Sequence, residues 1–258
     1  MNNIDFVEQI QKAILPSNKE MKEALVEYFI FHKPLERLSG DIYWFTQRGK
    51  KIFIAVVDCT GHGIGGALLS IFGNWTLDKL VKERHLSDPA LVLHELHSEV
   101  CRALKYGEGA KYLDGMDVAL CVIEKGKNKI TFAGARRPLF LVRFTPSPED
   151  SQKREAKLLV IKGDKKSIGG IQREKERVFS CKEIDVSPGD IMYLTTDGFT
   201  NQNNGEDQKY GLKRLITFLP MTARLPVAVQ EQYFEKELQD FMGEEEQRDD
   251  ITVIGVRV

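Results

Sequence analysis

The stretch of sequence that decides the fold runs Lys51-Ile-Phe-Ile-Ala-Val-Val-Asp58 and continues as Cys59-Thr-Gly-His-Gly63. Its apolar run, rich in Ile and Val, indicates a buried strand, and the glycines that follow indicate a tight turn. Upstream, Ile42-Tyr-Trp-Phe-Thr46 is separated from this strand by Gln47-Arg-Gly-Lys50, a spacing that predicts a β-hairpin. Asp58 therefore stands where a rigid strand ends and a turn begins.

Outside this hairpin, the pattern of apolar residues predicts the remaining elements. Helices are expected at about residues 4–14, 19–28, 64–83, 89–106, 210–219 and 226–242. Strands are expected at about residues 117–124, 129–133, 138–144, 157–161, 177–184, 191–195 and 251–258. The turns Gly126-Lys-Asn and Gly134-Ala-Arg-Arg predict one meander over residues 117–144. Adjacent hairpins with helices grouped in two places favour an α+β layered domain over alternating βαβ units.

Composition limits the classes of partner. The chain has 258 residues, with 37 Lys and Arg against 38 Asp and Glu, so its bulk charge gives no attraction for nucleic acid, and no nucleic-acid partner is expected. The four cysteines contain no CxxC pair, which favours reduced thiols. Cys59 to Leu77, the longest stretch without a formal charge, is too rich in glycine for a membrane span. The N-terminus has no apolar signal core, so we expect a cytoplasmic chain without membrane contact of its own.

Acidic residues recur where predicted strands begin or end. Asp41 precedes one strand, Asp58 and Asp197 each follow one, and Asp249-Asp250 opens the last. Carboxylates on rigid strands suit hard divalent cations such as Mg²⁺ or Mn²⁺, which prefer oxygen ligands. Any one of these residues, taken alone, is more often a turn or cap residue. Their repeated placement favours a metal site.

In their order and spacing, these motifs resemble the PPM/PP2C-type metal-dependent Ser/Thr phosphatases, in the bacterial branch that contains SpoIIE and RsbU. The resemblance covers almost everything from Ala13 to Val258. Its motifs are Ile14-Leu-Pro, Leu38-Ser-Gly-Asp41, Val57-Asp-Cys-Thr-Gly-His-Gly63, Phe132-Ala-Gly-Ala-Arg-Arg-Pro-Leu139, Ile168-Gly-Gly, Pro188-Gly-Asp190, Leu194-Thr-Thr-Asp-Gly198 and Asp249-Asp-Ile-Thr252. The resemblance implies an α-β-β-α sandwich of two antiparallel sheets flanked by helices.

The same resemblance implies a site that holds two Mn²⁺ or Mg²⁺ ions. Its metal ligands would be Asp41, Asp58, the backbone carbonyl of Cys59, Asp197 and Asp249, with Asp58, Asp41 and Asp197 as the catalytic residues. Asp249 is preferred over Asp250 by motif matching alone. The two ions would activate a water molecule for attack on phosphoserine or phosphothreonine, so no side-chain nucleophile is required.

Two departures from the family pattern concern a third metal. Many relatives have Asp at the position of Trp44 and an acid at the position of Asn201, so a third metal site is in doubt here. Asp114 and Asp117 are candidates for replacement oxygen ligands. Both also fit local roles, with Asp114 starting a turn and Asp117 capping a strand.

Two further groups near these motifs are candidates for contacts to phosphate. His62 lies in the glycine-rich turn, where it either touches phosphate or an entering proton or serves the turn's conformation. Arg136 and Arg137 lie in the second glycine turn. They either grip substrate phosphate or form a solvated hairpin tip.

Two other patterns in the sequence fit different sites. Gly61-His-Gly-Ile-Gly-Gly66 fits the GxGxxG pattern of dinucleotide-binding loops, but the strand before it belongs to a hairpin and an acid directly precedes the turn. His94, His97 and Cys101 share a helix at a spacing that fits metal ligands. An apolar stripe adjoins them, which favours a packing role.

We therefore expect a protein-serine/threonine phosphatase whose substrate is a phosphorylated bacterial regulatory protein, such as a STAS-type anti-sigma-factor antagonist. The alternatives are a catalytically weak phosphoprotein-binding module and, less favoured, a nucleotide-binding enzyme. Residues 1–20 are expected to form an N-terminal helix and linker with a regulatory or dimerisation role, and residues 21–258 the phosphatase domain. The helix over residues 4–14 predicts either a homodimer or docking onto that domain, and the chain is compatible with a place in a longer membrane sensor.

Overall fold

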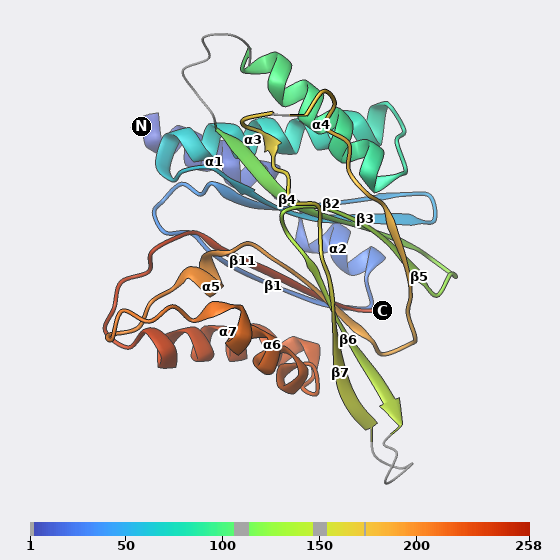
Figure 1. Ribbon diagram of the computed structural model, residues 1–258, viewed down its shortest axis with the longest axis vertical. Helices are drawn as coiled ribbons and strands as arrows, with labels where there is room; N and C mark the ends of the chain where they lie inside the picture. The colour runs from blue at the N-terminus through green and yellow to red at the C-terminus, as the bar shows by residue number, and fades with distance from the viewer. Residues whose placement is uncertain (1–2, 106–113, 147–153, 173) are drawn as a thin grey trace.

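The computed structural model describes residues 3–105, 114–146, 154–172 and 174–258, and these residues form layers of helices, sheet, sheet and helices (Figure 1). The expected sandwich of two antiparallel sheets is confirmed. The helices are α1 (Asn3–Ile14), α2 (Asn18–Ala24), α3 (Gly63–Asp78), α4 (Pro89–Ala103), α5 (Gly198–Asn201), α6 (Gly211–Thr222) and α7 (Val227–Met242), and a π-helical turn, η1 (Lys79–Glu83), extends α3.

The strands are divided between two sheets. One sheet, called the β11 sheet, has the order β1 (Glu27–Lys33), β11 (Ile251–Arg257), β10 (Ile191–Thr195), β6 (Leu139–Pro146) and β7 (Arg154–Ile161). The other, called the β3 sheet, has the order β2 (Asp41–Arg48), β3 (Lys51–Cys59), β4 (Gly115–Glu124), β5 (Lys129–Ala135) and β9 (Lys182–Asp185), and the short β8 (Ile168–Gly169) also pairs with β4. The hairpin predicted from residues 42–58 is thus β2–β3.

The expected meander over residues 117–144 is wrong in its last step. β4 and β5 pair in the β3 sheet, but β6 lies in the β11 sheet. Arg136 takes a left-handed conformation (φ 58°), and the Arg137 N–H donates to the carbonyl of Ala135 (2.7 Å). Pro138 follows and has no N–H to donate. The chain therefore bends at these residues and crosses between sheets instead of closing a hairpin.

Two other expected elements also differ from the structure. The helix predicted over residues 19–28 ends at Ala24, and β1 begins at Glu27, because β1 pairs along its whole length with β11. The strand predicted over residues 177–184 is reduced to β9. Arg177 is buried, and its guanidinium donates to three backbone carbonyls of residues 167–171, which folds the preceding loop around it.

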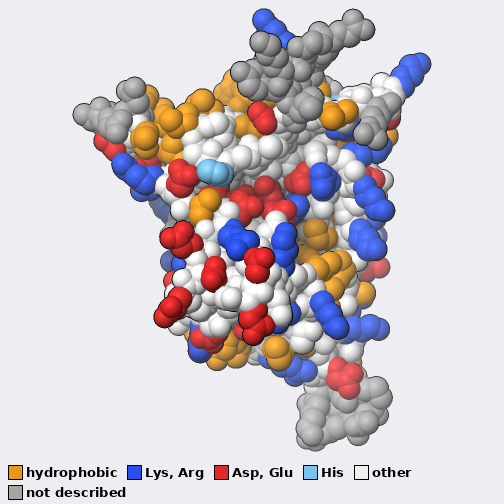
Figure 2. Space-filling view, turned by 60° about the vertical axis from the view of Figure 1, so that its left-hand side comes forward, with side chains coloured by type: hydrophobic (Ala, Val, Ile, Leu, Met, Phe, Trp, Pro, Cys, Tyr) orange, Lys and Arg blue, Asp and Glu red, His pale blue; other side chains and the backbone are white. Residues whose placement is uncertain are grey.

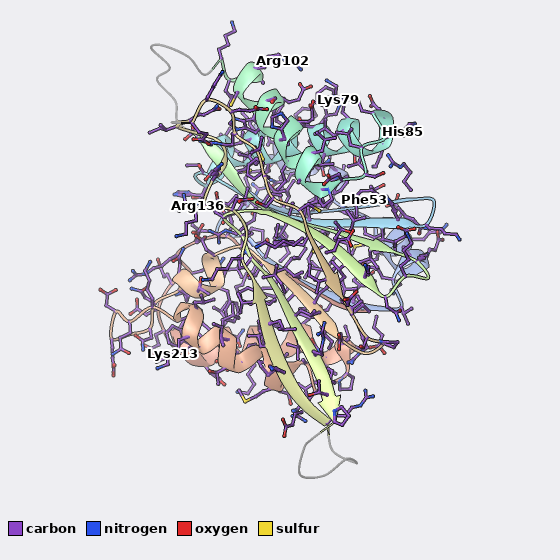
Figure 3. All side chains as sticks on the ribbon, turned by 45° about the vertical axis from the view of Figure 1, so that its right-hand side comes forward. Phe53, Lys79, His85, Arg102, Arg136 and Lys213 are labelled. Atoms are coloured by element: carbon purple, nitrogen blue, oxygen red, sulfur yellow. The ribbon has the colours of Figure 1, made fainter. Side chains whose placement is uncertain are left out.

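Three apolar clusters hold the layers together. One lies between the β3 sheet and the helices α3 and α4, with Phe53 fully buried beneath them (Figure 3). A second fills the space between the two sheets, and a third, which includes Phe199 and Phe234, packs α6 and α7 onto the β11 sheet. Fully burying one such side chain contributes about 1.5–3 kcal/mol. The strand ends are therefore held in fixed positions, which is what a site built from several strands requires.

The N-terminal helix α1 packs against α3. The buried Gln11 donates from Nε2 to the carbonyl of Ser39 (2.6 Å) and to Oγ of Ser70 (3.0 Å), and its Oε1 accepts from the Ser39 N–H (3.0 Å). The expected boundary after residue 20 falls inside α2. Across the ranges described above, no helix is both long enough and apolar enough to cross a membrane.

Candidate active site

Three carboxylates lie side by side on the β3 sheet. In the strand register, Asp41 of β2 is opposite Asp58 of β3, which is opposite Asp117 of β4. Residues directly opposite each other in antiparallel strands point to the same face of the sheet, and like charges placed there are destabilising. A row of three acids is therefore a place where a cation is expected.

The β11 sheet brings further acids to the same edge. Asp197 lies two residues after the end of β10, and Asp249 and Asp250 directly precede β11. A Cβ on Gly198 would overlap the carbonyl oxygen of Asp250, so glycine is required for these segments to meet. Figure 2 shows acidic side chains gathered in a hollow near the centre of one face, with a histidine on one side and Lys or Arg side chains on the other.

Arg137, at the crossover between β5 and β6, reaches into this acidic cluster. Its Nη2 lies 3.1 Å from Oδ2 of Asp197 and 3.2 Å from Oδ2 of Asp117, and its Nη1 lies 3.6 Å from Oδ2 of Asp58. Its side chain is only 12% exposed, and its buried Nε has no hydrogen-bond partner in the described part of the chain. Arg137 is thus an internal counter-ion, and the interpretation of Arg137 as part of a solvated hairpin tip is wrong.

Burial and crowding raise the pKa values of three of these acids. Burial, followed by the charge of Asp197, raises the pKa of Asp58 well above its ordinary value, although Arg137 opposes the shift. Burial and the charge of Asp58 do the same to the pKa of Asp41, and burial together with Asp197 raises the pKa of Asp249. The cluster therefore holds more negative charge than Arg137 neutralises.

Asp41 is fixed by hydroxyl groups of the opposite sheet. Its Oδ2 accepts hydrogen bonds from Oγ1 of Thr196 (2.5 Å) and from Oγ1 of Thr252 (3.0 Å). These bonds tie β2 to β10 and β11, and they leave Oδ1 of Asp41 as the oxygen open to another ligand. Neither threonine was singled out in the sequence, although Thr196 adjoins Asp197 and Thr252 closes the Asp249-Asp-Ile-Thr252 motif.

The two neighbouring acids before β11 have different surroundings. Asp250 is buried and accepts hydrogen bonds from the backbone N–H groups of Leu35 and Gly40, both at 2.7 Å, so its carboxylate holds the loop before β2. Asp249 is less enclosed, and its Oδ1 accepts from the N–H of Asp250 (2.9 Å). This difference supports the preference for Asp249 as the ligand.

Cys59 and the glycine-rich turn pack tightly against Gly40. The Cys59 side chain is buried in the apolar cluster beneath α3 and α4, and burial, followed by nearby acids, raises the pKa of its thiol well above the ordinary value. A Cβ on Gly40 or on Gly66 would overlap the carbonyl oxygen of Gly61. Close packing of two loops therefore explains the spacing of these glycines without a bound dinucleotide.

The remaining predicted site residues, His62, Arg136 and Asp114, are all exposed. Nδ1 of His62 is 2.7 Å from Oε1 of Glu36, and both side chains are more than half exposed. Arg136 is 59% exposed, with its Nε 3.5 Å from Oδ2 of Asp117. Asp114 is exposed just before β4. The structure thus places His62 and Arg136 beside the cluster, where both are accessible to solvent.

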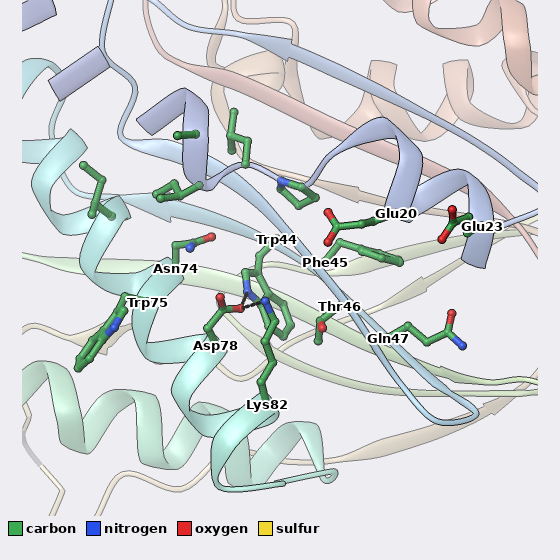
Figure 4. A pocket seen from close by; sticks show the side chains of 15 residues that line it. Glu20, Glu23, Trp44, Phe45, Thr46, Gln47, Asn74, Trp75, Asp78 and Lys82 are labelled. Atoms are coloured by element: carbon green, nitrogen blue, oxygen red, sulfur yellow. Dashed lines mark hydrogen bonds and ion pairs between the residues drawn. The ribbon is translucent and has the colours of Figure 1, made fainter. Parts of the chain in front are cut away.

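Asn201 and Trp44, the two residues that differ from the family pattern for a third metal, have well-defined contacts. Oδ1 of Asn201 accepts from the Lys209 ammonium (3.2 Å), which puts a cation beside the position where relatives have an acid. Trp44 lies on the opposite face of β2 from Asp41. It is buried next to a cavity of about 620 Å³, and its indole N–H donates to Asp78 (2.9 Å), which also pairs with Lys82 (Figure 4).

His94 and His97 of α4 form hydrogen bonds with the backbone of residues 169 and 177. Nδ1 of His97 accepts from the Gly169 N–H (3.0 Å), and Nδ1 of His94 is 2.8 Å from the carbonyl oxygen of Arg177. The favoured packing interpretation is supported.

Over the residues that the structure describes, no three His, Cys, Asp or Glu side chains converge closely enough to form a complete metal site. In the acidic cluster, Arg137 lies between the carboxylates.

Comparisons with known proteins agree with this architecture. The family model described as Stage II sporulation protein E (SpoIIE) matches residues 48–258. Phosphoserine phosphatase RsbU of Bacillus subtilis (strain 168) is 26% identical over 220 residues, which is 83% of this chain and 59% of RsbU. This chain therefore spans about three fifths of the length of that curated relative.

Solved structures show the same fold. The SiaA-PP2C domain of Pseudomonas aeruginosa has a TM-score of 0.84 and 30% identity, over 99% of this chain and 95% of that one. The PP2C phosphatase domain of SpoIIE from Bacillus subtilis, solved with a fragment of its regulatory domain, has a TM-score of 0.68 and 15% identity, over 90% and 63% of the two chains. The chain therefore belongs to the Stage II sporulation protein E (SpoIIE) family and carries a PP2C-type phosphatase domain.

Proposed function

We propose that this chain is a metal-dependent protein phosphatase that hydrolyses phosphoserine or phosphothreonine. The observation that carries the proposal is the row of Asp41, Asp58 and Asp117 on one sheet, which faces Asp197 and Asp249 from the other. Among the described residues, Arg137 is the basic group that lies within ion-pair distance of several of these acids. The excess negative charge and the all-oxygen donor set suit hard divalent cations.

Two Mn²⁺ or Mg²⁺ ions would be held by Asp41 through Oδ1, Asp58, the carbonyl of Cys59, Asp197 and Asp249. When bound, such ions lower the pKa of water and offset the charge of the phosphoryl oxygens. In the overall reaction, a water oxygen bonds to phosphorus, the bond from phosphorus to the serine oxygen breaks, and that oxygen takes a proton. Asp58 holds the centre of the carboxylate row, and Thr196 and Thr252 hold Asp41 in place beside it.

The proposed substrate is a phosphorylated bacterial regulatory protein of the STAS type. Family membership supports a protein substrate, and the relative RsbU is named a phosphoserine phosphatase. The hollow in which acidic side chains gather opens to solvent on one face, so a phosphorylated side chain on the surface of another protein has access to these acids (Figure 2). Because the chain spans only part of RsbU, the substrate is a proposal for this domain.

One observation favours the alternative of a catalytically weak phosphoprotein-binding module. Arg137 lies between three of the carboxylates, and Lys209 lies beside Asn201, so two side-chain cations occupy space near the proposed metals. In such a module, these basic groups would contact phosphate without turnover. Measurement of turnover separates the two functions.

The direct test of the proposed function is hydrolysis of p-nitrophenyl phosphate by the whole chain. We expect turnover with Mn²⁺, loss of turnover with a chelator and recovery when Mn²⁺ is added back. Unchanged turnover in the chelator would contradict metal dependence. If the folded protein shows no turnover at any Mn²⁺ concentration, the binding module becomes the better description.

For domain organisation, we propose that residues 1–20 form a segment that regulates residues 21–258 or mediates a homodimer. The contacts of Gln11 with Ser39 and Ser70 support regulation, because Ser39 lies two residues before Asp41 and its Oγ accepts from the Asp41 N–H (3.1 Å). Light scattering of the whole chain and of a chain lacking residues 1–14 tests the dimer. Equal association states in the two proteins would contradict dimerisation through α1.

A further inference from the structure

A second hollow adjoins the acidic cluster on the side of the β11 sheet. It is a cleft of about 690 Å³ that begins at Asp197 and runs between the crossover after β5, the strands β6 and β7, and the helices α5 and α6. Clefts of this size are typical of ligand sites. Because Asp197 belongs to both hollows, a chain segment bound in the cleft would start next to the proposed phosphate site.

The floor of the cleft is apolar. Phe140 and Leu215 are fully buried beneath it, and Val160 lies beside them. Leu212, at the start of α6, also lines the cleft and is 48% exposed, whereas Leu215 and Phe218 of the same helix are buried. The floor therefore offers contact area to one apolar side chain.

The rim of the cleft is basic. Arg136, Lys162 and Lys165 line it, and for the two lysines no carboxylate of the described residues lies within ion-pair distance. Asp164 lies between the lysines, but its carboxylate accepts from the N–H (2.6 Å) and the hydroxyl (3.1 Å) of Ser180. The lysine charges are thus unpaired and face a site where a negative partner would be favourable.

We propose that this cleft binds the residues that flank the phosphorylated serine, and that it selects an apolar side chain accompanied by acidic residues. The inference rests on the proposed phosphatase function and adds a sequence preference to it. An extended chain advances about 3.3–3.6 Å per residue, so a cleft that starts at Asp197 receives residues within a few positions of the phosphoserine. Binding energy from such flanking residues raises the specificity of an enzyme for its protein substrate.

The test compares two phosphoserine peptides that share one leucine near the phosphoserine and differ in their flanks, which are acidic in one and basic in the other. We expect kcat/KM for the acidic peptide to exceed that for the basic peptide by about tenfold or more. In the double variant Lys162→Glu/Lys165→Glu, this ratio should fall below one. Leu212→Ser should lower kcat/KM for the acidic peptide several-fold.

The control is Lys213→Glu, which makes one such lysine-to-glutamate change on α6 at a position that lines a different groove (Figure 3). It should leave the peptide ratio at its wild-type value. An equal ratio in wild type and the double variant would overturn the proposed preference, as would a wild-type ratio near one.

A binding measurement separates failure of this inference from failure of the proposed function. Fluorescence anisotropy reports the affinity of each labelled phosphopeptide for the whole chain without any need for turnover. We expect tighter binding of the acidic peptide by the wild type and loss of that difference in the double variant. If the wild type hydrolyses neither peptide but binds the acidic one selectively, the phosphatase proposal fails and the proposed preference of the cleft is retained. If both peptides bind equally, the cleft proposal fails.

Discussion

Nη2 of Arg137 lies 3.1 Å from Oδ2 of Asp197, and this ion pair joins the two sheets at the candidate active site. Asp197 follows a strand of the β11 sheet, whereas Arg137 lies where the chain leaves the β3 sheet. The same guanidinium also contacts Asp58 and Asp117 of the β3 sheet. One side chain therefore partly neutralises acids that both sheets contribute.

Replacement of Arg137 is expected to have opposite effects on folding and on metal binding. Arg137→Gln removes a buried partner of several carboxylates, so the free energy of unfolding in a chelator should fall by about 3 kcal/mol. Mn²⁺ affinity should rise, by roughly tenfold, because the competing positive charge is gone. Urea unfolding and calorimetric titration measure the two effects. Arg136→Gln is the control, since Arg136 is mostly exposed, and weaker Mn²⁺ binding by Arg137→Gln would contradict the counter-ion role.

A second prediction concerns Thr252, which donates to Asp41 (3.0 Å). Thr252→Val keeps the shape of the side chain but leaves a buried carboxylate with one donor fewer, which should cost about 1–3 kcal/mol of stability. Because Asp41 is then less firmly held, Mn²⁺ affinity should also decrease. Thr217→Val, on the exposed side of α6, serves as the control. Wild-type Mn²⁺ affinity in Thr252→Val would show that this hydroxyl does not position Asp41.

The free energy of unfolding at acidic pH should depend on His32. Burial lowers the pKa of His32 from its ordinary value to about 4, and its Nδ1 is 2.9 Å from Oγ1 of Thr252. Between about pH 6.5 and pH 4, the unfolded chain binds a proton that the folded protein does not. The free energy of unfolding should therefore fall as the pH is lowered through this range, by up to about 3 kcal/mol. His32→Gln should flatten this part of the curve, and an unchanged slope would exclude His32 as its cause.

The docking of α1 gives a prediction about local stability. Gln11→Leu removes three buried hydrogen bonds between α1 and the residues Ser39 and Ser70 and leaves the Ser39 N–H without its acceptor, so amide hydrogen exchange in α1 should become faster. Gln9→Leu is the matched control, because Gln9 is exposed on the same helix. If both variants retain wild-type exchange rates in α1, the Gln11 contacts do not hold the helix.

The sequence predicted the parts of the site that depend on local pattern. Asp58 ends a clearly apolar strand, and Asp197 and Asp249 each adjoin a strand as expected. The role of Arg137 was not predictable in this way, because it depends on the crossing of the chain from one sheet to the other. Gly134-Ala-Arg-Arg looks like a hairpin turn, and only tertiary packing shows that its second arginine points inward.

The same limit applies to the loop before β9. The apolar pattern over residues 177–184 predicted a strand, but Arg177 is buried by hydrogen bonds to carbonyls of a preceding loop. Such contacts have no periodic signal in the sequence. The sequence therefore predicted the strand ends that carry the acids, and it did not predict the basic and hydroxyl side chains that hold those acids in place.

The central claim is that Asp58 and its neighbouring acids form a metal-dependent phosphatase site. The most direct test measures the release of inorganic phosphate from a phosphoserine peptide as Mn²⁺ is titrated into the wild type, Asp58→Asn and a control variant. The control is Asp240→Asn, because Asp240 is exposed on α7. We predict Mn²⁺-dependent release by the wild type and the control, and at least a hundredfold less by a folded Asp58→Asn, in line with about 2.7 kcal/mol or more of lost transition-state stabilisation. Near wild-type, Mn²⁺-dependent release by Asp58→Asn would contradict the account.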